Sequence, residues 1–187
     1  MYRLQNCGIP ADFCSLLLHI LKNMKVYLKS EDMFSGNFTT TTGVLQGDVL
    51  SPTLFNLFTS DLPDHLNHEG VYLDSINVKY IMYADDLCLI ANDSDDLQRA
   101  LNNLERYCDK NSLVVNIAKS KLVIFHKGRL PKSEIFYKQP QLERVNEFTY
   151  LGITLSSQMS FSSHLKSLVM KANEATAYCK KHYVCVL

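Results

Sequence analysis

The chain has 187 residues, which suffices for one well-packed domain and leaves little room for a second full domain. Hydrophobic residues make up 47% and charged residues 20%, a globular balance that excludes disorder of the whole chain. The 19 basic and 19 acidic side chains give zero formal net charge, which argues against tight unassisted binding of nucleic acid but allows a local basic groove.

The first third of the chain is predicted to form two helices separated by a polar loop. Apolar residues at helical spacing predict a core-facing helix over residues 11–28, after a turn at residues 8–10. Residues 29–42 are polar and rich in threonine. Ser51, as a cap, and Pro52, at the first helical position, predict the start of a second helix, which Pro63 is expected to end or kink.

Residues 78–91 are the most informative stretch. A β-branched and aromatic run at 78–83 and an apolar run at 87–91 flank Ala84, Asp85 and Asp86, so the sequence predicts a β-hairpin with an acidic turn. Neither run alternates cleanly between apolar and polar residues. The hairpin is therefore expected to be buried on both faces.

The second half of the chain is predicted to add two helices and four strands. Ser94 is expected to cap a helix that reaches about Asn111, with Asp95 and Asp96 solvated at its start. Strands are predicted at residues 113–115, 122–125, 148–151 and 153–155, and a final helix from about Phe161. Apolar residues expected to face inward on the two helices are Leu97, Leu101, Leu104, Cys108, Leu165, Leu168, Val169 and Ala172. The order of elements indicates an α+β fold, an antiparallel sheet backed by helices.

The cellular setting is predicted from the cysteines and from the apolar runs. There are six cysteines and no Cys-x-x-Cys pair, so a disulfide framework and a zinc site are both poorly supported. A reducing, intracellular compartment, either cytoplasm or nucleus, is expected. No apolar run is long enough to span a membrane, and the first residues lack a signal-peptide pattern, so neither membrane insertion nor secretion is expected.

The adjacent carboxylates of Asp85 and Asp86 are the strongest chemical signal. Two charges about 6 Å apart repel by roughly 3 kcal/mol at an effective dielectric near 20, and a divalent cation reverses the sign of that energy. Oxygen ligands of this kind suit Mg²⁺, and a pair of such ions can clamp the two oxygens of a phosphoryl transfer. The alternative is an ordinary turn, because Asp bonds well to nearby backbone groups.

Four segments in order resemble the motifs of reverse transcriptases. Residues 83–86 resemble the Tyr-Ala-Asp-Asp box, residues 43–55 the segment before it, residues 115–120 the Asn-x-x-Lys-Ser/Thr element after it, and residues 148–152 the Tyr-Leu-Gly turn. The likeness runs from about Leu4 to Lys180 and is strongest to enzymes of non-LTR retrotransposons. It implies a palm with partial fingers in residues 1–158, and the start of a thumb helix with a divergent tail in residues 159–187.

The resemblance also assigns roles to single residues. It makes Asp85 a metal ligand and Asp86 a second ligand or electrostatic partner, for Mg²⁺ or Mn²⁺. It places Lys119 beside the leaving pyrophosphate. Further contacts that it implies are nucleotide and template binding by Gln46, Gly47, Tyr83 and Ala84, and a primer grip formed by Tyr150, Leu151 and Gly152. The alternatives are a packed strand aromatic at 83, an ordinary loop at 46–47 and a lone surface lysine at 119.

One family motif has no counterpart in the sequence. The palm of the family carries a further Asp on an apolar strand, whereas residues 1–42 contain only Asp12, at a predicted helix start, and Asp32, in a polar loop. The chain is therefore expected to begin downstream of that motif. Two carboxylates under-neutralise two divalent ions, so metal binding is expected to be weak and polymerisation by this chain alone slight or absent. The missing strand is expected to leave a sheet edge open to association.

The expected function follows from these assignments. The chain is predicted to be a fragment of a retrotransposon reverse transcriptase, whose parent makes DNA from RNA by two-metal nucleotidyl transfer with an RNA template, a DNA primer and dNTPs. A non-catalytic remnant that binds nucleic acid or protein is the first alternative, and an unselected remnant of a mobile element the second. A metal-dependent phosphohydrolase is the least supported, because no nucleophile motif lies near the acidic pair.

Overall fold

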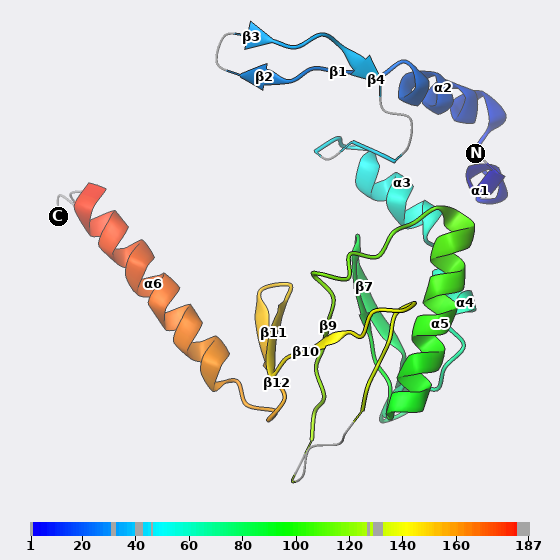
Figure 1. Cartoon of the computed structure of the whole chain (residues 1–187). Coiled ribbons are helices and arrows are strands. Elements are labelled where there is room, and N and C mark those ends of the chain that lie inside the picture. Colours follow the sequence, from blue (N-terminus) through cyan, green and yellow to red (C-terminus); the bar gives the residue numbers. More distant parts are fainter. Residues whose placement is uncertain are drawn as a thin grey trace.

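The structure is a computed structural model that describes residues 2–30, 33–39, 43–45, 47–126, 128 and 133–182. Groups of helices and groups of strands follow one another along the described residues, and Figure 1 shows how they are arranged. In chain order the elements are α1 (Tyr2–Asn6), α2 (Ala11–Lys22), β1 (Lys25–Val26), β2 (Lys29–Ser30), β3 (Met33–Phe34), β4 (Phe38–Thr39), α3 (Ser51–Phe58), α4 (Leu62–His65), β5 (Val71–Leu73), β6 (Ile76–Val78), β7 (Tyr80–Tyr83), β8 (Asp86–Leu89), α5 (Ser94–Asn111), β9 (Lys121–Leu122), β10 (Glu143–Arg144), β11 (Glu147–Tyr150), β12 (Ile153–Ser156) and α6 (Ser162–His182).

The strands form separate short ladders rather than the one antiparallel sheet that was predicted. Among the described residues there are six two-stranded ladders, and only β9 with β10 is parallel. Most of the antiparallel pairs are hairpins between strands that follow each other in sequence, such as β7 with β8 and β11 with β12. The mixture of helices and strands agrees with the α+β prediction. None of the helices in the described ranges has the length and hydropathy that crossing a bilayer requires.

Helix α5 forms the centre of the main hydrophobic core. The apolar stripe predicted for it is confirmed, because Leu101, Leu104 and Cys108 are buried and Leu97 packs against them. The helix bounds are also confirmed, but the cap is Asp93 rather than Ser94, since the Asp93 side chain accepts a hydrogen bond from the Asp96 N–H at 2.7 Å. The remaining buried members of this core are Leu62, Leu66, Tyr107, Leu122, Ile135, Tyr137 and Leu142.

The predicted helix at 11–28 is wrong in its last third. Helix α2 ends at Lys22, and the Asn23 side chain donates to the backbone oxygen of His19 at 2.8 Å, which closes the last turn. The predicted core-facing stripe is also largely exposed, because Leu16 within the helix is 52% and Leu28 beyond it 66% exposed. Residues 25–39 instead form the ladders β1–β4 and β2–β3, which extend away from the body in Figure 1. The predicted polar loop at 29–42 is therefore partly strand.

The second predicted helix begins one residue earlier than expected, with Ser51 inside the helix and not its cap, and it ends early. Leu50 occupies the cap position of α3, and Ser51 lies in the first turn, where its hydroxyl donates to the Asp48 carboxylate at 3.3 Å. The helix stops at Phe58, five residues before Pro63. Pro63 instead sits in the first turn of α4, where its missing N–H costs nothing.

Three other predictions fail in whole or in part. Residues 113–115 form no strand, although Leu113 and Val115 pack against the core, and of the strand predicted at 122–125 only Leu122 pairs, as part of β9 (Lys121–Leu122). The final helix α6 is present, but its apolar side chains do not face inward. Leu165, Leu168 and Val169 are 46–59% exposed, and Figure 1 shows the helix leaving the body beside β12.

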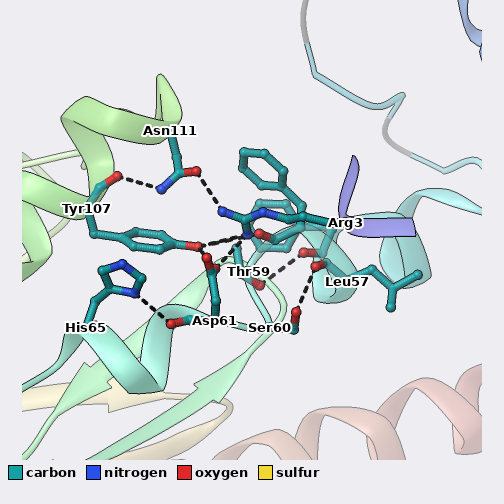
Figure 2. A network of polar contacts seen from close by, with 10 residues as sticks. Arg3, Leu57, Thr59, Ser60, Asp61, His65, Tyr107 and Asn111 are labelled. Atoms are coloured by element: carbon teal, nitrogen blue, oxygen red, sulfur yellow. Dashed lines mark hydrogen bonds and ion pairs between the residues drawn. The ribbon is translucent and has the colours of Figure 1, made fainter. Parts of the chain in front are cut away.

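A polar network ties the first helix to the body. Arg3 of α1 donates to the Asp61 carboxylate at 2.6 Å and to the Asn111 side-chain oxygen at 2.8 Å (Figure 2). Tyr107 of α5 donates to the same Asp61 carboxylate at 2.7 Å. Burial, this hydrogen bond and the Asp61 charge raise the pKa of Tyr107 to about 12, so the phenol remains a donor at neutral pH. The network joins α1, α5 and the connection between α3 and α4.

A second polar corner fixes the base of the β7–β8 hairpin. Asp96 is only 1% exposed, which contradicts its predicted solvation, and its carboxylate accepts from the Glu69 and Gly70 N–H groups at 3.0–3.2 Å and from Arg99 at 2.8 Å. His68, 4% exposed, places Nε2 at 3.1 Å from the Lys79 oxygen and 3.0 Å from the Ile90 oxygen. Both partners are acceptors, so Nε2 carries the proton. The two carbonyls belong to the two chain segments that enter and leave the hairpin.

The stability of the fold is expected to fall on acidification in a way that depends on Asp96. Burial opposes ionisation of this carboxyl, but its hydrogen bonds from Glu69, Gly70 and Arg99 and the nearby His68 lower its pKa overall. Its contribution is therefore fully present above the unfolded pKa of about 3.9 and is lost as the pH falls through the lower folded value. Denaturant unfolding at pH 7 and at about pH 3 should show a smaller loss of stability in Asp96→Asn than in wild type. Parallel losses in the two proteins would contradict this account.

Candidate functional site

The acidic turn lies at the tip of a hairpin with a two-residue connection. Tyr83 pairs with Asp86, so Ala84 and Asp85 form the turn. Ala84 has φ 52°, a left-handed conformation that costs a residue with a Cβ roughly 1–2 kcal/mol, while Asp85 keeps a negative φ. This sign pattern is that of a type II′ turn, which normally has Gly at its first position. The strained Ala84 therefore lowers the stability of the turn, and strained backbone of this kind is common at functional sites.

The two faces of this hairpin have different environments, so the prediction that both are buried is wrong. Tyr80, Met82, Leu87 and Leu89 alternate along the strands and pack against the main core. On the opposite face Ile81 and Tyr83 are exposed by 48% and 67%. The Asp85 and Asp86 side chains are also exposed. Tyr83 is therefore not a packed strand aromatic, and both carboxylates are open to a ligand.

A second hairpin, β11–β12, meets the outward face of the first. Tyr150 pairs with Ile153 across a turn in which Leu151 has φ 47° and Gly152 has φ 83°, the signs of a type I′ turn. The Tyr150 hydroxyl lies 3.2 Å from the Ile81 backbone oxygen and 3.1 Å from the Asp86 backbone oxygen. The strands predicted at 148–151 and 153–155 are thus confirmed as a hairpin, to within a residue at each end. Its hydroxyl contact brings the predicted primer-grip turn to the acidic hairpin.

The chemistry around Tyr150 favours a neutral, hydrogen-donating phenol. Burial, and to a lesser extent nearby Cys88 and Asp86, raise the pKa of Tyr150 above its ordinary value. Burial likewise raises the pKa of the Cys88 thiol on the same face. Neither group is ionised at neutral pH.

The structure does not join the other predicted residues to the acidic tip. Lys119 lies in a turn where its backbone N–H donates to Asn116, and its side chain is exposed. None of the hydrogen bonds and ion pairs shown for the described residues connects Lys119 with Asp85 or Asp86. Gly47 has φ 88° and open space where a Cβ would lie, so its conformation, not crowding, explains the glycine. Gln46 falls outside the described residues.

Two surface cavities have linings that contain none of the predicted site residues. One, of about 430 Å³, is lined by residues 122, 133–134 and 141–144, and the other, of about 590 Å³, by residues 105 and 138–140. In the part of the chain that the structure describes, no three or more His, Cys, Asp or Glu side chains converge as a metal cage. Asp85 and Asp86 fit Mg²⁺ as a partial ligand set, because this ion commonly takes one or two carboxylates and fills its other positions with water and phosphate oxygens.

Sequence reasoning missed two supports of the site. His68 and Asp96 hold the base of the β7–β8 hairpin, but neither stands in a motif, and Asp96 has the same local pattern as its solvated neighbour Asp95. A partial signal was present in Gly70, which has φ 74° and whose added Cβ would lie 2.7 Å from the Val78 oxygen. A glycine between two polar residues and a strand indicates a close backbone approach.

Comparison with known proteins identifies the family. A sequence model of the family described as reverse transcriptase (RNA-dependent DNA polymerase) matches residues 1–155. The chain belongs to this family.

The relatives are polymerases of mobile elements. The chain is 30% identical over 132 residues to an RNA-directed DNA polymerase from the mobile element jockey of Drosophila funebris, a match that covers 67% of the chain and 14% of the relative. It is 24% identical over 181 residues to a probable RNA-directed DNA polymerase from transposon X-element of Drosophila melanogaster, covering 94% of the chain and 19% of the relative. With the probable polymerase from transposon BS of the same fly it shares 29% over 167 residues, covering 84% and 18%. The predicted likeness to retrotransposon enzymes is confirmed, and the chain spans less than a fifth of these relatives' length.

Proposed function

We propose that this chain supplies the acidic hairpin of a site that makes DNA on an RNA template. The observation that carries the proposal is the exposed pair Asp85 and Asp86, one in the strained Ala84–Asp85 turn and the other at the start of β8, in a chain that belongs to the reverse transcriptase family. The hairpin is anchored at its base by His68 and meets the β11–β12 hairpin through Tyr150. Such anchoring matters because polymerisation depends on positioning charged groups beside the reacting phosphate.

In this proposal Asp85 and Asp86 hold Mg²⁺ or Mn²⁺. When bound, the ions supply charge neutralisation for the attacking and leaving oxygens of nucleotidyl transfer. The exposed Tyr83 ring and the Ala84 backbone border the incoming nucleotide and the primer end, and the Leu151–Gly152 turn supports the primer strand. Gln46 and Gly47 contact the nucleotide and template, and Lys119 stabilises the leaving pyrophosphate. The palm and partial fingers correspond to residues 1–158 and the thumb to residues 159–187.

Charge balance limits what this chain does alone. Two divalent ions carry four positive charges, and the two carboxylates of the tip supply two negative ones. Because no further acidic side chain of the described residues converges on them, we expect metal binding to be weak. The copying of RNA with a DNA primer and dNTPs is proposed for a complete polypeptide in which another carboxylate joins the pair. Little or no incorporation is expected from the 187 residues by themselves.

Replacing Asp85 with Asn is expected to weaken Mn²⁺ binding by about tenfold or more, since loss of even an indirect partner of a metal ligand costs about 10–100-fold. Titration of the chain with Mn²⁺, followed by the electron paramagnetic resonance signal of the free ion, measures this change. Asp95→Asn is the matched control, because it removes one charge from the other Asp-Asp pair of the chain. Equal weakening in both variants would mean that only net charge matters, and the proposed site would be wrong.

A primer-extension assay with an RNA template, a DNA primer and dNTPs tests the activity directly. Incorporation that disappears in Asp85→Asn would support the site and overturn the expected inactivity of the chain. Salt-sensitive RNA binding with no incorporation, unchanged by Asp85→Asn, would favour a non-catalytic binding role instead.

A further inference from the structure

The contact of Tyr150 with the acidic hairpin suggests a role for its hydroxyl that is separate from gripping a primer. The hydroxyl lies within 3.2 Å of backbone oxygens on both strands, that of Ile81 on β7 and that of Asp86 on β8. These partners are 69 and 64 positions away in sequence. A single side chain thus bridges two hairpins that the chain builds independently.

The contact lies close to the turn of each of the two hairpins. On one side, the acceptor Asp86 is itself one of the two acidic residues of the tip and pairs with Tyr83 across the ladder. On the other side, Tyr150 directly precedes the Leu151–Gly152 turn, whose two left-handed residues leave little freedom between anchor and tip. The hydrogen bond therefore connects the two turns through very few rotatable backbone bonds.

The inward face and the base of the β7–β8 hairpin are fixed by other contacts, so the Tyr150 contact acts on its outward face. The inward face of β7–β8 packs in the main core, and His68 holds the two segments at the base. The outward face carries no comparable packing, because Ile81 is 48% and Tyr83 67% exposed. The phenol hydroxyl has one proton and can donate it to either carbonyl.

We propose that Tyr150 is a positioning residue, whose hydroxyl sets the spacing and orientation of the Leu151–Gly152 turn relative to the Asp85–Asp86 carboxylates. The use of this arrangement to place the end of a nucleic-acid strand rests on the proposed function, whereas the mechanical role of the hydroxyl does not.

Tyr150→Phe tests the role, because it removes the hydroxyl and keeps the ring. In the ¹⁵N-labelled full chain, loss of a donor at the Ile81 and Asp86 carbonyls should shift the amide nitrogens of the following residues, Met82 and Leu87. Residual dipolar couplings of β7–β8 and β11–β12 should fit one common orientation in wild type and lose that common fit in Tyr150→Phe. Tyr72→Phe is the matched control, because the Tyr72 side chain is 67% exposed on β5, and it should change neither observation.

The outcomes separate this inference from the proposed function. Unchanged Met82 and Leu87 shifts, or a common orientation retained in Tyr150→Phe, would overturn the positioning role. Mn²⁺ added to the wild type should broaden the amide signals at Asp85 and also those at Leu151 and Gly152. Absence of broadening at Asp85 would count against the metal site, while the metal-free couplings would still decide the role of Tyr150. Broadening that persists at Asp85 but is lost at Gly152 in Tyr150→Phe would support both.

Discussion

Replacing Asp96 with Ala is expected to destabilise the fold by about 2 kcal/mol or more, because a buried backbone donor left without its acceptor costs about 1–3 kcal/mol, and both Glu69 and Gly70 lose theirs. Asp96 is 1% exposed, and its carboxylate accepts hydrogen bonds from the Glu69 and Gly70 N–H groups and from Arg99. Alanine would leave the buried Gly70 donor without an acceptor. Guanidinium unfolding at pH 7, with the midpoint and slope fitted separately, measures the loss.

Asp95→Ala provides the control for this change. Asp95 lies in the same first turn of α5 and is exposed, so its loss should cost a few tenths of a kcal/mol, the scale of an exposed helix-dipole interaction. Similar losses in the two variants would show that Asp96 acts through the helix dipole and not through the corner it holds. A large loss for Asp96→Ala alone would identify this corner as a support of the β7–β8 hairpin.

Gly70→Ala is expected to cost about 2–4 kcal/mol, of which roughly 1–2 kcal/mol comes from the left-handed backbone and the rest from overpacking. Gly70 has φ 74°, and an added Cβ would lie 2.7 Å from the Val78 oxygen, a backbone atom that cannot rotate away. The Gly70 oxygen also accepts from the Asn92 side chain at 2.6 Å, which fixes the segment further. Thermal or denaturant unfolding measures the effect.

Gly8→Ala separates the two causes. Gly8 has a similar φ of 79° but nothing within 4 Å of an added Cβ, so it should report the backbone cost alone. If Gly8→Ala and Gly70→Ala destabilise equally, the close approach at Gly70 contributes nothing. A larger effect at Gly70 should be accompanied by loss of amide protection in β7 and β8, because the crowded atoms belong to the segment that leads into β7.

The elements predicted well are those whose signal is local. The β7–β8 hairpin, α5 and the β11–β12 hairpin each combine a periodic run with a turn or cap signal, and each is found close to its predicted bounds. The errors arise where tertiary context decides. The apolar stripe of residues 11–28 cannot reveal that most of it has no core to meet. Val115 and Leu113 are partly buried without a strand partner, which periodicity does not distinguish from pairing.

The candidate site shows the same division. Motif order singled out Asp85 and Asp86, and in the structure both are exposed at the tip of the β7–β8 hairpin. The supports came only from the structure. Asp95 and Asp96 are adjacent in sequence but have opposite environments, and nothing in the local pattern tells them apart. The hydroxyl contact of Tyr150 joins segments more than 60 positions apart, so no local pattern could predict it.

Because helix α6 projects from the body, a small change in its direction moves its far end over a large distance. Its 21 residues correspond to a rod of about 30 Å, so a tilt of about 10° at the root moves the far end by about 5 Å. Near that root, Ser163 donates to Glu147 and the Thr154 N–H donates to His164, which ties the direction of the rod to the β11–β12 hairpin. A small rotation of that hairpin would therefore move the far end of α6 by a larger distance. Conversely, a molecule that displaces the far end of α6 would change the orientation of the turn at residues 151–152.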